Sequence, residues 1–318
     1  MNERFDLTGR SVIITGGGKG IGKVYAQEFA KAGARVVAAD IDGAAAQSVA
    51  EALAAQGFET IGLATDIASE ESTKAMAQAA LERFGAIDVL INNASLMSVP
   101  PRRSWLEIPV EEWDRVMAVN LRGMFLSCRA VFPAMKAQRR GKIVNISSSR
   151  VWEGTPNRLH YTTSKAGVVG FTRALAREVG EFGITVNAVT PGMTQSETQV
   201  QSSSANYLAT RIGGRAIERV QVPADLVGAV MFLSAAASDF HDRTDDQRRR
   251  RQGHALGARG GPAAPPSPLS PWRRICARAH RTRPFAPSAV ARRNRPPVSS
   301  RRPYVLCAEA RPTPPACP

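Results

Sequence analysis

Cysteine and long apolar runs are scarce in this sequence. Four of the 318 residues are cysteine, and only Cys128 lies before residue 240. A single cysteine cannot form a disulfide within that region, which is typical of a protein from a reducing compartment. No segment has the roughly 18 consecutive apolar residues that a membrane-spanning helix needs, and the opening MNERFDLTGR lacks the apolar core of a signal peptide. We therefore expect a cytoplasmic protein that does not enter a membrane.

Lysine is absent from residues 241–318, although the chain carries a formal net charge of +15. That stretch holds 17 arginines, 14 of the 21 prolines and only four acidic residues, so residues 1–240 are close to neutral. High proline content and like charges leave little apolar surface to bury, which predicts a disordered tail rich in Arg, Pro and Ala. The sequence therefore divides into a folded domain, residues 1–240, and a basic tail, residues 241–318.

Short β-branched runs alternate with segments of helical periodicity throughout the first 240 residues. This alternation is typical of the α/β class, and it predicts a single doubly wound parallel sheet of the Rossmann-like type. A long polar segment without clear periodicity, residues 191–222, is predicted to be a loop above the carboxyl edge of the sheet. The predicted strands are Ser11–Thr15, Arg35–Ala39, Thr60–Ala64, Asp88–Ile91, Lys142–Ile146 and Thr185–Val189. The predicted helices are Gly20–Ala32, Gly43–Gln56, Glu70–Phe84, Val110–Lys136, Leu159–Phe182 and Ala224–Ser234.

A glycine-rich segment joins the first predicted strand to the first helix. Its spacing is Thr-Gly-x-x-x-Gly-x-Gly, which differs from the G-x-G-x-x-G of the general dinucleotide fingerprint. Glycines let backbone N–H groups approach a pyrophosphate, and the helix N-terminus supplies positive potential. Glycines also suit a plain tight connection, but this position in the fold favours a dinucleotide site. The predicted contacts are Thr15, Gly16, Gly18, Lys19, Gly20, Ile21 and Gly22.

Asp40 ends the second predicted strand, 18 residues after Gly22. A carboxylate at this place accepts hydrogen bonds from the adenine ribose hydroxyls and repels a 2′-phosphate, so we expect NAD rather than NADP as the cofactor. Lys19 in the glycine loop favours NADP, and Asp40 would also serve simply to cap a turn.

Tyr161 and Lys165 are four residues apart on a predicted helix and therefore share one face. A phenol is a poor base at neutral pH, but a neighbouring ammonium group stabilises the phenolate and lowers its pKa. Ser148 follows the fifth predicted strand, where its hydroxyl would reach the same substrate oxygen. Asn120 is a candidate for holding a water that links Lys165 to solvent. Each residue alone is a weak signal, but all four lie downstream of a dinucleotide loop near the ends of neighbouring strands.

These residues together resemble the short-chain dehydrogenase/reductase family over residues 5–240. The resemblance implies that Tyr161 is the general acid/base, Lys165 lowers its pKa and binds the nicotinamide ribose, Ser148 orients the substrate, and Asn120 completes a proton relay. It also implies a homodimer or homotetramer. Further cofactor contacts are implied at Asp66, which resembles the adenine contact, and at Ile67, Asn92, Ala94, Pro191, Gly192 and Ser196.

Two features refine the family resemblance. Ser95 replaces the glycine of the family motif Asn-Asn-Ala-Gly, next to the cofactor. Runs at residues 132–136 and 170–176 are similar to bacterial secondary-alcohol dehydrogenases that act on aryl alcohols and ketones. The resemblance thus implies hydride transfer between nicotinamide and a small secondary alcohol or ketone. A 3-oxoacyl-thioester reductase and an inactive NAD-binding product are the alternatives.

Other side chains have weaker assignments. No metal site is predicted, and His160 is expected to be a core or helix-surface histidine. Candidates for the walls of the substrate pocket are Leu96, Met97, Trp152, Met193 and Tyr207. Ordinary packing in the fold accounts for these apolar residues equally well.

The chain departs from the family after Phe240, where a seventh strand reading approximately M-T-G-Q-T-x-x-V-D-G-G is expected. The residues there are HDRTDDQRRRRQG, which synonymous codons can encode so that a frame one base later reads M-T-G-Q-T-I-N-V-D-G-G-K. This match predicts a frameshift at Phe240 or His241, an out-of-frame tail, and a sheet without its seventh strand. The alternative is a natural basic arm for nucleic acid or anionic membrane, although aromatic residues for base stacking are sparse there.

Overall fold

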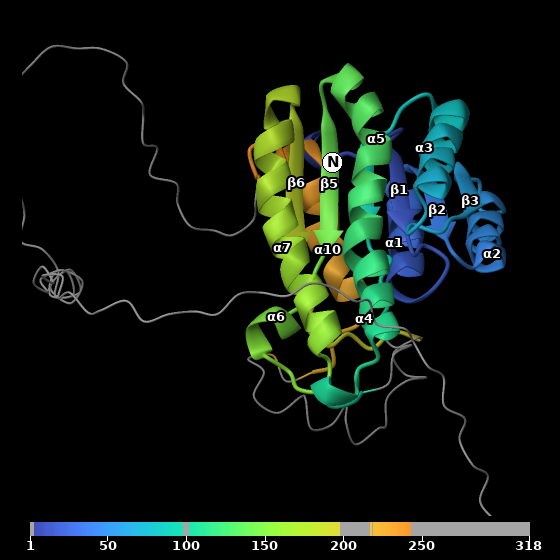
Figure 1. Cartoon of the computed structure of the whole chain (residues 1–318). Coiled ribbons are helices and arrows are strands. Elements are labelled where there is room, and N and C mark those ends of the chain that lie inside the picture. The colour runs from blue at the N-terminus through green and yellow to red at the C-terminus, as the bar shows by residue number, and fades with distance from the viewer. Residues whose placement is uncertain (1–2, 98–101, 198–216, 218, 243–318) are drawn as a thin grey trace, which may run out of the picture. The chain divides into compact units, whose positions relative to one another are not determined.

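The computed structural model describes residues 3–97, 102–197, 217 and 219–242. Its centre is a parallel six-stranded sheet with the strand order β3-β2-β1-β4-β5-β6 (Figure 1). The basic tail beyond residue 242 and the pocket candidate Tyr207 lie outside the described residues. The strands are β1 Ser11–Thr15, β2 Arg35–Asp40, β3 Thr60–Ala64, β4 Val89–Asn92, β5 Gly141–Ile146 and β6 Ile184–Val189.

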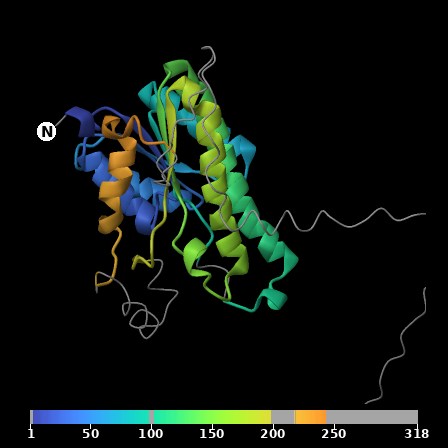
Figure 2. The ribbon, with the colours of Figure 1, turned by 90° about the vertical axis from the view of Figure 1, so that its left-hand side faces the viewer.

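Helices cover both faces of the sheet, as the sequence predicts (Figure 2). One face packs against α1 Gly20–Lys31, α2 Gly43–Ala54 and α10 Ala224–Ser234. The other face packs against α3 Glu70–Phe84, α5 Met124–Gln138 and α7 Leu159–Val179. Because both faces are buried, β1 is apolar without alternation: Val12 and Ile14 enter one core and Ile13 the other.

The long helix predicted over residues 110–136 is instead divided in three. It consists of α4 Val110–Met117, a π-helical turn Ala118–Gly123 and α5. A second difference is α6 Arg150–Glu153, a single helical turn where the sequence predicts no helix. It ends at Gly154, whose φ of 59° lies in the left-handed region where a glycine carries no steric cost.

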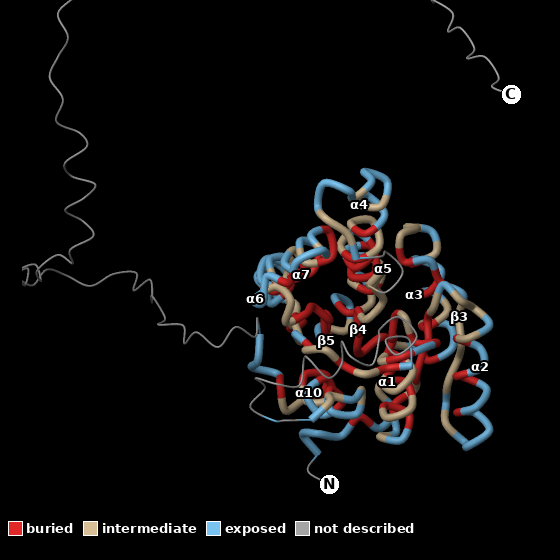
Figure 3. Tube along the Cα trace, turned by 90° about the horizontal axis from the view of Figure 1, so that it is seen from below, coloured by how far each residue is buried: buried red, intermediate tan, exposed pale blue. Residues whose placement is uncertain are grey.

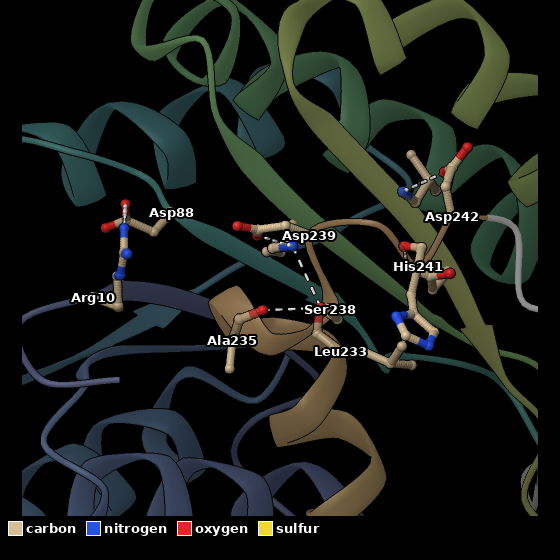
Figure 4. Close-up of polar contacts among 11 residues, drawn as sticks. Arg10, Asp88, Leu233, Ala235, Ser238, Asp239, His241 and Asp242 are labelled. Carbon is tan, nitrogen blue, oxygen red and sulfur yellow. Dashed lines mark hydrogen bonds and ion pairs between the residues drawn. The ribbon is translucent and has the colours of Figure 1, made fainter. Parts of the chain in front are cut away.

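β6 is the last strand of the sheet within the described part of the chain. After α10 the chain passes beside this strand without forming another one there, and side chains and carbonyl groups occupy part of its outer edge (Figure 4). The Val186 backbone N–H donates to Asp242 Oδ1 at 3.3 Å, and Asn187 Nδ2 donates to the His241 carbonyl at 2.8 Å. Lys142 Nζ, from β5, lies 2.7 Å from Asp239 Oδ1. Irregular backbone therefore lies beside part of the edge of β6.

The topology brings the carboxyl ends of all six strands to one edge of the sheet, which faces the viewer in Figure 3. The chain moves outward from β1 to β3 and then returns to β4 on the other side of β1. Ligands of open parallel sheets bind at such a reversal point, outside the carboxyl ends of the strands. The loops after β1, β2, β4, β5 and β6 are therefore the place to look for a site.

Candidate active site

A cavity of about 1060 Å³ lies at this edge, between the loops that follow the six strands. It contains both the glycine loop and the tyrosine and lysine of α7. Most residues predicted from the sequence line it, namely Gly16, Lys19, Gly20, Ile21, Asp40, Asp66, Ile67, Ala94, Ser148, Tyr161, Lys165, Pro191, Gly192 and Ser196. Leu96, Met97 and Met193 line it too, whereas Trp152 is not among the lining residues and is 69% exposed. The candidate role of Trp152 as a pocket wall is therefore wrong for this structure, because α6 carries it to the surface.

The glycine loop is built around close backbone approaches. A Cβ atom on Gly22 would lie 1.9 Å from the Gly16 carbonyl oxygen, so only glycine fits there. Thr15 fixes the loop from below: its Oγ1 accepts the backbone N–H groups of Asn93 and Ala94 at 3.1 and 3.2 Å. Thr15, Gly18 and Gly22 do not line the cavity; they shape the loop that does.

Asp40 is fixed by two backbone hydrogen bonds at the end of β2. Its Oδ2 accepts the Gly18 N–H at 3.0 Å, and its Oδ1 accepts the Asp42 N–H at 3.0 Å. Lys19 Nζ lies 2.6 Å from Asp42 Oδ2, so a carboxylate already balances the lysine charge that favours NADP. This pairing raises the pKa of Lys19 and lowers that of Asp42.

Tyr161, Lys165 and Ser148 lie together in the buried wall of the cavity. Lys165 Nζ donates to the Ile146 carbonyl at 2.8 Å and lies 5.8 Å from the centre of the Tyr161 ring. The Tyr161 hydroxyl forms a side-chain hydrogen bond with Ser148. Ser147 Oγ donates to the Lys165 carbonyl at 2.7 Å and ties α7 to the end of β5. The spacing of these residues in the sequence predicted this cluster.

Burial dominates the protonation of this cluster. It raises the pKa of Tyr161, while the hydrogen bond from Ser148 and the charges of Arg150 and Arg158 lower it. Burial also lowers the pKa of Lys165 to about 8. The net shift of the Tyr161 pKa is therefore upward, because loss of hydration outweighs the charges of Arg150 and Arg158. The lowering of the tyrosine pKa by Lys165 stays a prediction.

Asn120 lies in the π-helical turn, and its side chain joins three segments. Its Oδ1 accepts the Leu96 N–H at 2.7 Å, and its Nδ2 donates to the Leu96 carbonyl and to Ser164 Oγ at 3.1 and 3.0 Å. Ser164 Oγ in turn donates to the Tyr161 carbonyl at 2.7 Å. The Asn120 amide is thus used to hold the loop after β4 against α7, and the residue does not line the cavity.

Asn92 lies below the cavity rather than along it. Its side chain is buried, with Nδ2 donating to Asn145 Oδ1 at 2.8 Å and to Cys128 Sγ at 3.3 Å. The residues after it, Asn93 and Ala94, line the cavity instead. Asn92 itself does not line the cavity, because its side chain faces the core from β4. A cofactor contact through the backbone region beside it stays a prediction.

Several site residues were not predicted from the sequence as part of the site. Arg115 and Arg150 line the cavity, and Asn93 Nδ2 donates to the Thr15 carbonyl at 3.0 Å. A signal existed only for Asn93, within the Asn-Asn-Ala motif. His160 is fully buried, with Nε2 3.1 Å from Glu112 Oε1. Of its two expected placements, core and helix surface, the structure shows the core.

Neither a metal cluster nor a membrane helix is found in the part of the chain that the structure describes. No three His, Cys, Asp or Glu residues gather there in a way that would hold a metal ion. None of the described helices is long and apolar enough to cross a bilayer.

Comparison with known proteins identifies the family. The sequence profile of the short chain dehydrogenases matches residues 10–206. The chain belongs to this family. Its members are oxidoreductases that bind a nicotinamide cofactor. The cavity fits such a cofactor because the glycine loop lines it, and Gly22 permits the close backbone approach within that loop that a Cβ atom would block.

Individual relatives share most of the folded region. A probable galactose dehydrogenase of Rhizobium meliloti (strain 1021) is 37% identical over 73% of this chain and 91% of that protein. A 3-oxoacyl-[acyl-carrier-protein] reductase of Chlamydia trachomatis is 33% identical over 74% of this chain and 93% of that protein. The solved structure of a 7α-hydroxysteroid dehydrogenase, complexed with NADH and 7-oxo glycochenodeoxycholic acid, aligns with a TM-score of 0.73 and 29% identity over 76% of this chain and 94% of that chain.

Proposed function

We propose that this dehydrogenase transfers hydride between NAD and a small secondary alcohol or ketone, with Tyr161 as the general acid/base. The observation that carries the proposal is the convergence of Tyr161, Ser148 and Lys165 on a cavity that also takes in the glycine loop. A phenol within hydrogen-bonding reach of a second hydroxyl suits a carbonyl or carbinol oxygen placed between them.

Each side chain has a separate task in this proposal. Tyr161 donates a proton to the substrate oxygen in reduction and accepts it in oxidation, while Ser148 hydrogen-bonds the same oxygen. Lys165 has a pKa of about 8 and is mostly protonated at pH 7, so its ammonium group favours the Tyr161 phenolate and holds the nicotinamide ribose. The bound nicotinamide supplies or accepts the hydride. Asn120 supports a proton relay through the segments that it joins.

The charges at the adenosine end of the cavity support NAD over NADP. The fixed carboxylate of Asp40 would repel a 2′-phosphate, and Lys19 is already paired with Asp42. Asp66 also lines the cavity, which supports its proposed contact with the adenine.

A 3-oxoacyl-thioester reductase is the second candidate. The similarity to the Chlamydia trachomatis reductase favours it, as does Arg150 in the cavity wall, which would suit an anionic substrate. A protein that binds NAD without turnover is the third possibility.

Replacing Tyr161 with phenylalanine tests the proposal. We expect turnover to fall by about 10²- to 10⁴-fold, because the ring keeps its packing but loses the transferable proton. The dissociation constant for NADH, measured by fluorescence titration, should stay within about twofold. Activity is followed as NADH fluorescence with secondary alcohols, ketones and 3-oxoacyl thioesters, with NAD and NADP in parallel. Wild-type activity in Tyr161→Phe would refute the role of the tyrosine.

We further propose that residues 1–240 are a cytoplasmic dehydrogenase domain, that it forms a homodimer or homotetramer when the sheet is complete, and that residues 241–318 are an out-of-frame translation. The departure from the family sequence directly after Phe240 supports this reading. Sequencing the DNA around codons 240 and 241 tests it, since unrelated codons in an uninterrupted frame would exclude the frameshift. Nucleic-acid binding that falls steeply with salt would instead indicate a natural basic arm.

A further inference from the structure

The segment after β6, residues 191–197, forms one wall of the cavity. Pro191, Gly192, Met193, Thr194 and Ser196 all line it. We call residues 191–197 the strap; in the proposed function it borders both the cofactor and the substrate. Thr194 forms an isolated parallel bridge with Gln221. The position of the strap depends on what holds it at each end.

Two attachments hold the strap on the side of β5 and α10. The Ser149 N–H donates to the Pro191 carbonyl at 2.9 Å. Further along, the Gln195 N–H donates to the Gln221 carbonyl at 2.8 Å, and Thr194 Oγ1 lies 3.1 Å from Gln221 Oε1. These contacts lie at Pro191, Thr194 and Gln195.

The third attachment crosses to the start of α1. Glu197 Oε1 accepts the Gly20 backbone N–H at 2.9 Å, and Glu197 Oε2 lies 3.8 Å from Lys23 Nζ. A carboxylate at a helix N-terminus is favourable, because it meets an N–H group without a helical partner and the positive end of the helix dipole. Glu197 therefore connects the strap to the glycine loop itself.

Glu197 lies outside the cofactor cavity. It lines a neighbouring hollow of about 440 Å³ together with Gly18, Lys19 and Lys23, and it is not among the residues lining the main cavity. Its carboxylate thus reaches the helix terminus from the outer side, while Gly20 and Ile21 face inward. This placement leaves the inner side of the glycine loop open to a diphosphate.

We infer that Glu197 is a positioning residue that fastens the strap over the bound dinucleotide and slows its release. The inference rests on the proposed function. A dinucleotide enclosed between the glycine loop and residues 191–196 can leave only when the strap moves, and the Glu197 contact opposes that movement. A half-exposed contact of this strength opens readily, which suits a cofactor that is exchanged in each turnover.

The opposite effect has a physical basis as well, and it makes the test sharp. A carboxylate near the glycine loop repels a bound diphosphate, so its removal would tighten binding if repulsion outweighed the fastening. Weaker NADH binding after removal of the Glu197 carboxylate indicates fastening, and tighter binding indicates repulsion.

The experiment compares Glu197→Ala and Glu197→Gln with the wild type. Dissociation constants come from NADH fluorescence titration, and dissociation rates from stopped-flow displacement. For Glu197→Ala we expect the dissociation constant to rise about 3- to 10-fold, mainly through faster dissociation, because a charge-assisted hydrogen bond is lost. Glu197→Gln should show a smaller rise, since its amide oxygen still accepts the Gly20 N–H.

Two controls separate fastening from a general structural effect. Glu28→Gln, in an exposed pair with Lys31 on the same helix, should leave NADH binding unchanged. AMP lacks the nicotinamide half of the cofactor, which lies beneath the strap. Its dissociation constant, measured by competition with NADH, should therefore be the same in Glu197→Ala as in the wild type. An equal loss of AMP affinity, unchanged NADH dissociation, or tighter NADH binding would each overturn the inference. If the wild type itself binds no NADH, the proposed function fails instead.

Discussion

At the scale of single residues, Lys165 shows how burial sets the chemistry of the site. Its ammonium group is buried, with Nζ bonded to the Ile146 carbonyl, and this lowers its pKa from 10.5 to about 8. Retaining a proton there costs free energy in the folded state, which is accepted because the proposed reaction needs a positive charge beside Tyr161. The residue should therefore leave a signature in the pH dependence of stability.

Replacing Lys165 with methionine should remove that signature. Between pH 8 and about 10.5 the unfolded wild type binds a proton that the folded form has released, so its free energy of unfolding gains a contribution that rises with pH. Relative to Lys165→Met, we expect the wild type to gain up to roughly 3 kcal/mol across this range. Urea unfolding at pH 7, 8.5 and 10 measures the difference, with exposed Lys31→Met as the control. A difference that does not change with pH would contradict the shifted pKa.

At the scale of elements, the division between α4 and α5 is the feature that positions the site. The π-helical turn places Asn120 against the loop after β4 and against α7, two segments that carry cavity-lining residues. Turns of this kind cost helical regularity and occur frequently at functional sites. Hydrophobic periodicity does not reveal such a turn, because six residues are too few to define a separate period.

Replacing Asn120 with alanine should weaken this connection. Three hydrogen bonds of a buried amide are lost, and the Leu96 N–H is left without that partner, so we expect the free energy of unfolding to fall by about 1–3 kcal/mol. Turnover should fall as well, because Leu96 and Tyr161 lie on the segments that Asn120 joins. Chemical denaturation measures the first effect, and exposed Gln47→Ala on α2 provides the comparison. A loss below about 0.5 kcal/mol would show that the amide is not a structural link.

At the scale of the whole molecule, the central strands of the sheet have more hydrogen-bonding partners than its β6 edge. β1 and β4 are central, and near their amino ends Asp88 accepts the Ser11 N–H at 3.0 Å and pairs with Arg10 at 3.2 Å (Figure 4). On its outer edge β6 lies beside irregular chain, to which the Val186 N–H and the Asn187 side chain donate hydrogen bonds. Partly satisfied strand edges tend to pair with other strands or to associate.

Restoring the other reading frame after Phe240 should add a seventh strand to the sheet beside β6. A chain that continues with M-T-G-Q-T-I-N-V-D-G-G-K supplies a strand with alternating apolar residues for β6. We expect a midpoint of thermal unfolding higher by several degrees, since pairing buries both backbone groups and apolar surface. Differential scanning calorimetry and size-exclusion chromatography compare it with the present chain. Equal stability and equal oligomeric state in the two chains would count against the missing strand.

The sequence by itself determined the sheet, most of its helices and the grouping of Tyr161, Lys165 and Ser148 at one cavity. Apolar periodicity, glycine spacing and the i, i+4 relation of Tyr161 and Lys165 are local signals, and local geometry preserves them in the fold. Only the tertiary structure decided the direction of the Tyr161 pKa shift, the burial of Asn92 and the contact of Glu197 with α1. Each of these depends on hydration lost or partners gained between segments far apart in the chain, which spacing along the sequence does not record.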